Sequence, residues 1–112
     1  MDIHDEHSSG VTVVVPRGRL DAASAPLMEQ RLIALVDAGH HRLVLDLTGV
    51  TYTSSVGVRV LLLIAKRLAR VGGRLVLCAL SQPVRTVLEH AGFGSIIPMH
   101  PDRESGVAAA RE

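Results

Sequence analysis

The chain has 112 residues, the size of one ordinary domain, and a formal net charge of only +1 from 12 basic and 11 acidic side chains. Hydrophobic residues make up 47% of it, enough apolar surface for a core without a disulfide framework or a structural metal. The balanced charge and an aromatic content of 2% argue against a nucleic-acid-binding protein, because such proteins need a positive excess and aromatic platforms for bases.

The amino-terminal segment and the single cysteine indicate the compartment. Residues 1–10 are polar and acidic, unlike a signal peptide, and the longest apolar stretch, 60–65, is far too short to cross a bilayer. Cys78 lies in an apolar run, where we expect it to be buried and reduced. We therefore predict a cytoplasmic protein without membrane insertion. We expect one domain over 1–112, with its core over about 11–98.

The first predicted elements are two strands and a helix. Residues 11–15, nearly all valine, predict a buried strand, and residues 3–7 predict a weaker edge strand that pairs with it through a turn. A loop over 18–21 then leads to a helix that we expect Ser24 to cap. The expected apolar face of this helix consists of Leu27, Met28, Leu32, Leu35 and Val36.

The middle of the chain repeats the strand-helix order. Residues 43–45 predict a second buried strand, and the segment 47–55, rich in threonine and serine, is expected to be a loop. Residues 57–71 predict a second helix that two adjacent glycines end. Its expected core-facing stripe consists of Val58, Leu61, Ala65 and Leu68.

The last third predicts a strand over 74–80, a short helix that Ser81 caps, and a final strand at 96–97. The segment 102–112 is expected to be either a disordered tail or a weak terminal helix. Strands that alternate with helices predict an α/β fold with parallel strand pairs, and the continuous apolar strands predict a sheet covered by helices.

The second predicted helix carries an unusual outer side. Arg59, Leu63, Lys66 and Arg70 follow one another at helical spacing, so Leu63 is expected to lie among cations on a solvent-facing surface. Two interpretations stay open. Leu63 is either one scattered exposed apolar side chain, which is common, or the centre of an apolar and basic surface that docks another protein.

A hydroxyl-rich turn, Thr53-Ser54-Ser55, precedes this helix. A hydroxyl there lies beside unpaired backbone N–H groups and the positive end of the helix dipole. One interpretation is that Ser54 or Ser55 caps the helix. The other is a phosphorylation site, because a phosphoserine is tolerated by a helix start but would hinder docking of a partner on the same surface.

Four segments together resemble one family. They are residues 18–22 (GRLDA), 45–52 (LDLTGVTY), 54–62 (SSVGVRVLL) and 72–77 (GGRLVL). In this order and spacing they resemble the STAS domain (sulphate transporter and anti-sigma-factor antagonist) over about 11–98. The resemblance implies an α/β fold of the STAS type, with a mixed central β-sheet and helices packed against it.

The resemblance also implies a mechanism, partner switching. An antagonist of this kind binds an anti-sigma factor that is itself a serine kinase, is phosphorylated by it and released, and is reset by a serine phosphatase. The chain itself is then expected to have no catalytic residue, cofactor or metal. The predicted partner-binding residues are Asp21, Ser54, Ser55, Val56, Gly57, Arg59, Leu63 and Lys66.

One departure from the family leaves alternatives open. The family's turn usually carries its phosphate on the residue before the glycine, and that residue is Val56 here, which has no hydroxyl. Ser55 or Ser54, or the preceding Thr53, takes the phosphate instead, or the protein is a phosphorylation-independent scaffold. A small-ligand module for a nucleotide or lipid is a further alternative. For Asp21 the alternatives are shaping the partner surface or forming an Asx turn.

Enzymatic chemistry is not expected. The six histidines form no metal-ligand spacing with cysteine or carboxylate, and the adjacent His40 and His41 are expected to be solvated. No nucleophile elbow surrounds Ser55, and the phosphate-binding glycine motifs are missing.

Overall fold

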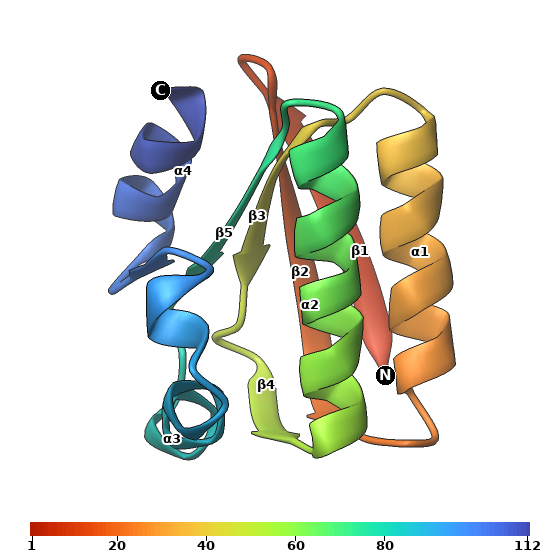
Figure 1. Ribbon diagram of the computed structural model, residues 1–112, viewed down its shortest axis with the longest axis vertical. Coiled ribbons are helices and arrows are strands. Elements are labelled where there is room, and N and C mark those ends of the chain that lie inside the picture. Colours follow the sequence, from red (N-terminus) through yellow and green to blue (C-terminus); the bar gives the residue numbers. More distant parts are fainter.

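A six-stranded mixed sheet lies at the centre of the computed structural model, which describes residues 1–112 (Figure 1). In chain order the elements are β1 (Asp2–Ser8), β2 (Val11–Leu20), α1 (Ala25–Asp37), β3 (Arg42–Asp46), β4 (Val50–Thr53), α2 (Ser55–Arg70), β5 (Arg74–Cys78), α3 (Gln82–His90), a 3₁₀ turn (Phe93–Ser95), β6 (Met99–His100) and α4 (Arg103–Arg111). The predicted α/β class and the mixed sheet are confirmed.

The strand order is β1-β2-β3-β5-β6, with β4 paired to the far end of β2. β1 runs antiparallel to β2 across a tight turn, as predicted, and every other pair is parallel. The long strand β2 has two partners in succession: Thr12–Val14 pair with β3, and after an irregularity at Gly18 the end of β2 pairs with β4. This change of partner strand places the end of β2 beside the start of α2.

Two apolar layers lie on opposite faces of the sheet because side chains alternate along each strand. On one face, Val14 and Leu45 pack with α1 and α2, which lie side by side in Figure 1. On the other face, Val44, Val76 and Cys78 pack under α4. Cys78 is buried as predicted, and burial, together with the nearby Asp46 charge, raises the pKa of its thiol to about 12.

The carboxyl-terminal segment is an ordered helix rather than a disordered tail. Gly106 and Ala110 of α4 are buried, and the absence of a side chain at Gly106 lets the helix approach Cys78. Arg103 Nε donates to Asp46 Oδ2 at 2.9 Å, and Arg42 donates to the backbone carbonyl of Arg111 at the other end. The sequence predicted only a weak helix here, because helical periodicity does not reveal tertiary contacts of this kind.

Three predictions about strands and the loops beside them were wrong. The segment 47–55 contains β4, which is short, has one partner strand and buries only Val50 and Thr53, so no alternation reveals it. Residues 96–97 do not form the expected strand but follow the 3₁₀ turn. Pairing with β5 begins instead with the Pro98 carbonyl, which accepts from Leu77 N–H. The predicted loop over 18–21 likewise is strand as far as Leu20.

The helix faces also required correction. In α1 the buried residues are Ala25, Met28, Leu32 and Val36, whereas Leu27 is 46% exposed and Leu35 is only half-buried. In α2 they are Gly57, Val60, Leu61, Ile64 and Leu68, while Val58 and Ala65 are half-buried. The serines before α1 and α3 occupy the cap positions, but neither side chain caps its helix: Ser24 Oγ donates to the Arg19 carbonyl and Ser81 Oγ to the Val50 carbonyl.

Acid is expected to loosen the contact between the sheet and α4. Burial alone would raise the pKa of Asp46, but hydrogen bonds from Thr48 and Arg103 outweigh it and hold the pKa below its ordinary 3.8. The stability that these bonds contribute is therefore complete above pH 3.8 and is lost as the pH falls through the lower folded-state value. Urea unfolding midpoints should drop as the pH falls below about 4, and the drop should be smaller in Asp46→Asn.

Candidate partner-docking site

The serine turn connects β4 to α2 and is held by the backbone. Ser54 N–H donates to the Leu20 carbonyl at 2.9 Å, which ties the turn to the end of β2. Ser54 occupies the cap position of α2 with an extended backbone, yet its side chain makes no capping bond, and its Oγ is buried without a partner. Ser54 thus holds the cap position that one interpretation of the sequence gave it, but its hydroxyl does not cap the helix.

Ser55 differs from Ser54 in exposure. It is the first residue of α2 and its side chain is exposed to solvent. The N–H groups of the first helical turn have no helical partner and point toward this end, which carries the positive end of the helix dipole. Of the two serines, only Ser55 thus presents its hydroxyl to an approaching molecule. Thr53 is buried, and its hydroxyl donates to the Ser54 carbonyl.

Gly57 lets α2 pack closely against the end of β2. A Cβ placed there would lie 2.5 Å from Thr53 Oγ1 and 2.6 Å from Leu20 Cγ. Gly57 is buried, which argues against the direct partner contact predicted for it.

Gly57→Ala is expected to lower the free energy of unfolding by about 1–3 kcal/mol, because β4 or α2 must shift to make room for the methyl group. Gly94→Ala is the matched control, since a Cβ at Gly94 meets nothing within 4 Å. Urea denaturation of both variants measures the difference. Equal stability of the two proteins would show that the turn is not tightly packed.

Asp21 organises the loop between β2 and α1. Its Oδ1 accepts hydrogen bonds from the backbone N–H groups of Ala23 at 3.1 Å and Ser24 at 3.2 Å, which is the Asx-turn arrangement. The Ser24 N–H bond, with smaller help from Ala23 and Arg19, holds the pKa of Asp21 below its ordinary value. Asp21 therefore shapes the loop from within, and its predicted contact with a partner stays a prediction.

An open groove of about 320 Å³ lies between the beginnings of α1 and α2. Its lining consists of Ala22, Ala25, Pro26, Glu29, Val56, Arg59, Val60 and Leu63. The sequence predicted the α2 side of this groove but missed the α1 side. The signal was present in Pro26, which occupies the first turn of α1 and lies on its exposed side.

The outer side of α2 is exposed as its spacing predicted. Leu63 is 42% exposed, and Arg59, Lys66 and Arg70 are exposed around it. The predicted site residues therefore fall into two sets. The first set, hereafter the α2 face, consists of Ser55, Val56, Arg59, Leu63 and Lys66, of which Val56, Arg59 and Leu63 line the groove. The second set consists of the buried Ser54 hydroxyl and Gly57, and of Asp21 in the neighbouring loop.

An aromatic side chain that the sequence left unassigned borders the same end of the sheet. The Arg19 guanidinium stacks over the Tyr52 ring at 4.2 Å from its centroid, and Arg19 Nε lies 3.7 Å from Asp21 Oδ2. Tyr52 is 37% exposed on β4. β2 and β4 are paired here, so the stacked side chains of Arg19 and Tyr52 lie at the same end of the sheet as the serine turn. Tyr52 adds a rigid aromatic ring to this surface.

Comparison with known proteins identifies the family. A family model described as the STAS domain matches residues 2–106, which include β1 and the start of α4. The chain belongs to the STAS domain family. The match extends beyond the 11–98 over which the sequence motifs show the resemblance.

Named relatives of this STAS domain cover most of its length. BtrV of Bordetella bronchiseptica, described as a proposed anti-sigma factor antagonist, is 46% identical over 100 residues, spanning 89% of this chain and 86% of BtrV. The crystal structure of an anti-sigma factor antagonist from Mycobacterium paratuberculosis has 28% identity and a TM-score of 0.91, covering 99% of this chain and 94% of that one. A Thermotoga maritima structure with 19% identity and a TM-score of 0.93, covering 98% of this chain and 95% of that one, shows the shared fold.

None of the helices in this STAS domain combines the length and the apolar composition that a membrane span requires.

Proposed function

We propose that this STAS domain is an anti-sigma-factor antagonist, a cytoplasmic regulatory module that binds an anti-sigma factor of the serine kinase type and has no catalytic activity of its own. The observation that carries the proposal is the α2 face, where an exposed leucine among cations adjoins an open apolar groove. Relatives named as anti-sigma factor antagonists support the same function.

The α2 face has the composition of a docking surface. Leu63 and Val56 supply an apolar centre, and Arg59 and Lys66 supply a basic rim, a combination typical of protein interfaces with arginine near the centre. Glu29 is the one acidic side chain of the groove. We infer that the partner presents an apolar side chain to the groove and carboxylates to Arg59 and Lys66.

Ser55 is the proposed phosphate acceptor. It is exposed, whereas the Ser54 hydroxyl is buried and out of reach of a kinase. A phosphate on Ser55 would carry about −1.5 to −2 charges and lie at the favourable end of the helix dipole. Arg59 follows Ser55 by four residues on the same side of the helix, so the phosphate would also attract the cation that the partner needs. Phosphorylation then releases the partner, and a serine phosphatase restores binding.

Incubation with the serine kinase anti-sigma factor and ATP tests the switch. Intact mass should show one phosphate on the native chain and on Ser54→Ala, and none on Ser55→Ala. Ser55→Asp should bind the kinase more weakly than Ser55→Ala does. Binding of the native chain without any phosphate transfer would instead support the phosphorylation-independent scaffold, which Val56 at the usual acceptor position favours. No binding at all would contradict the proposed function itself.

A further inference from the structure

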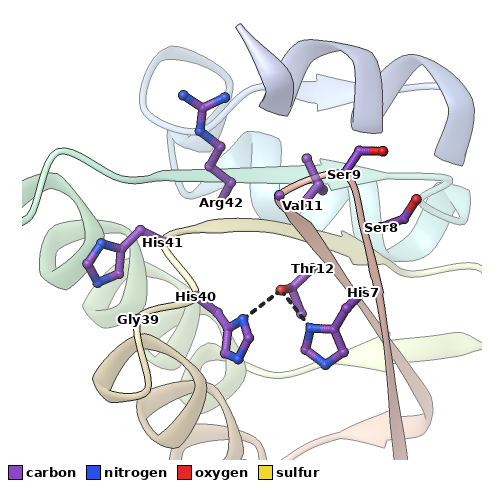
Figure 2. A pocket seen from close by; sticks show the side chains of 10 residues that line it. His7, Ser8, Ser9, Val11, Thr12, Gly39, His40, His41 and Arg42 are labelled. Atoms are coloured by element: carbon purple, nitrogen blue, oxygen red, sulfur yellow. Dashed lines mark hydrogen bonds between the residues drawn. The ribbon is translucent and has the colours of Figure 1, made fainter.

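A polar hollow of about 490 Å³ lies at the end of the sheet away from the serine turn. The tight turn between β1 and β2 and the loop between α1 and β3 form its walls (Figure 2). His7, His40, His41 and Arg42 line it, along with serine and threonine hydroxyls, and no carboxylate does. A hollow of this size suits a small ligand, and its lining is rich in histidine.

One end of a hydrogen-bond chain in this hollow is fixed by a carboxylate. Asp5 Oδ1 accepts from Arg31 at 2.6 Å, and Asp5 Oδ2 lies 2.7 Å from His7 Nε2. The Arg31 hydrogen bond holds the pKa of Asp5 below its ordinary value, so the carboxyl is ionised. An ionised carboxylate only accepts, and His7 Nε2 must therefore carry a proton and donate it.

The buried Thr12 hydroxyl connects His7 to His40 and thereby determines which His40 nitrogen carries a proton. Thr12 Oγ1 lies 3.2 Å from His7 Nδ1 and 3.3 Å from His40 Nδ1, and both rings turn toward it in Figure 2. In neutral His7 the Nδ1 atom is bare, so the single Thr12 proton is donated to it. The Thr12 oxygen then accepts from His40 Nδ1–H. This arrangement leaves His40 Nε2 with a free lone pair and no partner within the protein.

Protonation adds charge at one defined atom. A proton on His40 Nε2 leaves the whole chain of hydrogen bonds intact, whereas a proton on His7 Nδ1 would displace the Thr12 donor. The centroids of the His7 and His40 rings lie 4.7 Å apart. Among the nearby charged groups, Asp5 and Arg31 neutralise each other, and the Arg42 guanidinium is already engaged with the carbonyl oxygen of Arg111.

We propose that this hollow binds a phosphate-type oxyanion, free or as the phosphoryl group of a small metabolite, with protonated His40 donating to it through Nε2. A metal ion fits less well, because the chain has no cluster of three or more histidine, cysteine or acidic side chains that could hold one. The site is separate from the α2 face, so it goes beyond the proposed docking function.

Titration with inorganic phosphate, followed through the histidine ring and Gly10 amide resonances in NMR spectra, tests the site. Saturable binding is expected, about tenfold tighter near pH 6 than near pH 8, because His40 can donate through Nε2 only when that atom carries a proton. Phosphate itself gains negative charge over this interval, so weaker binding at the higher pH can arise only from the protein. Equal affinity for glycerol phosphate would indicate that the phosphoryl group suffices, and tighter binding would indicate an organic metabolite.

Variants separate the site from general charge effects. His40→Gln should weaken phosphate binding about tenfold and abolish its pH dependence, whereas His90→Gln, an exposed histidine at the end of α3, should change neither. Thr12→Val keeps the side-chain shape but breaks the hydrogen-bond chain that determines which His40 nitrogen carries the proton. It should therefore also weaken phosphate binding. Shifts that do not saturate, that chloride reproduces at equal ionic strength, or that persist in His40→Gln would overturn the proposal. Zinc binding in place of phosphate would also overturn it.

Discussion

Leu63→Asp is expected to weaken binding to the anti-sigma factor by at least about 30-fold, the effect of removing a residue at the centre of an interface. Leu63 is 42% exposed and lines the groove with Val56. On docking it would be covered, and a carboxylate there would have to lose its water without an assigned partner. Arg59 lies one turn earlier and attracts acidic groups of the partner, which are also repelled by the new charge. Calorimetric titration at fixed salt measures the loss.

Val71→Asp is the matched control for this effect. Val71 is 48% exposed at the end of the same helix, outside the groove, so the same change of side chain should leave affinity within about twofold. Both variants should unfold in urea within about 0.5 kcal/mol of the native chain, because both sites are at the surface. A similar loss of affinity in both variants would mean that charge on α2 matters and the groove does not. Unchanged binding of Leu63→Asp would remove the α2 face from the proposal.

The fold could be predicted from the sequence where local pattern and burial agree. The valine run of β2 and the apolar centres of β3 and β5 are buried on both faces, and such strands consist of continuous apolar residues. β4 was missed because it is an edge element whose two middle residues are exposed. α4 was underestimated because its docking depends on Gly106, a poor helix former that matters only once Cys78 lies against it.

The candidate site, too, could be predicted only where it depends on local sequence. Spacing alone placed Arg59, Leu63 and Lys66 on one exposed side, because helical periodicity is a local property. The groove was not predicted, since it exists only where the start of α1 meets α2. Leu27 illustrates the reason. Its size favoured an inward position, but the small Ala25 is buried instead and the apolar face of α1 follows Met28 and Leu32.

The exposure of the serines likewise needed three dimensions. Ser54 and Ser55 are equivalent as neighbours in a turn, and the helix dipole favours a phosphate on either. Only the pairing of β4 with the end of β2, which draws Ser54 N–H to the Leu20 carbonyl, turns one hydroxyl inward. The orphaned Ser54 hydroxyl costs stability on its own, on the order of 1–3 kcal/mol for a buried unpaired polar group. Packing thus leaves Ser55 as the serine of this turn with an exposed hydroxyl, which is why it is the proposed acceptor.

Gly106→Leu is expected to lower the free energy of unfolding by about 2–4 kcal/mol and to expose the Cys78 thiol. A Cβ at Gly106 already lies 3.1 Å from Cys78 Cβ and 3.4 Å from Val44 Cγ1, so a larger side chain forces α4 off the sheet. The helix then loses the contacts of Arg103 with Asp46. Urea unfolding measures the stability, and the rate of reaction with a thiol reagent measures the uncovering of Cys78.

Ala108→Leu is the control for the change of side chain itself, because Ala108 is exposed on the same helix and leucine and alanine have similar helix propensities. Its stability should stay within about 0.5 kcal/mol of the native chain, and its thiol should stay unreactive. Cys78 is protected both by burial, which raises its pKa to about 12, and by the helix that covers it. Detachment of α4 removes both protections, so the thiol rate should rise in Gly106→Leu even at urea concentrations where the protein remains folded. A slow reaction of the Cys78 thiol combined with a large loss of stability would show that the leucine disturbs the core while α4 stays in place.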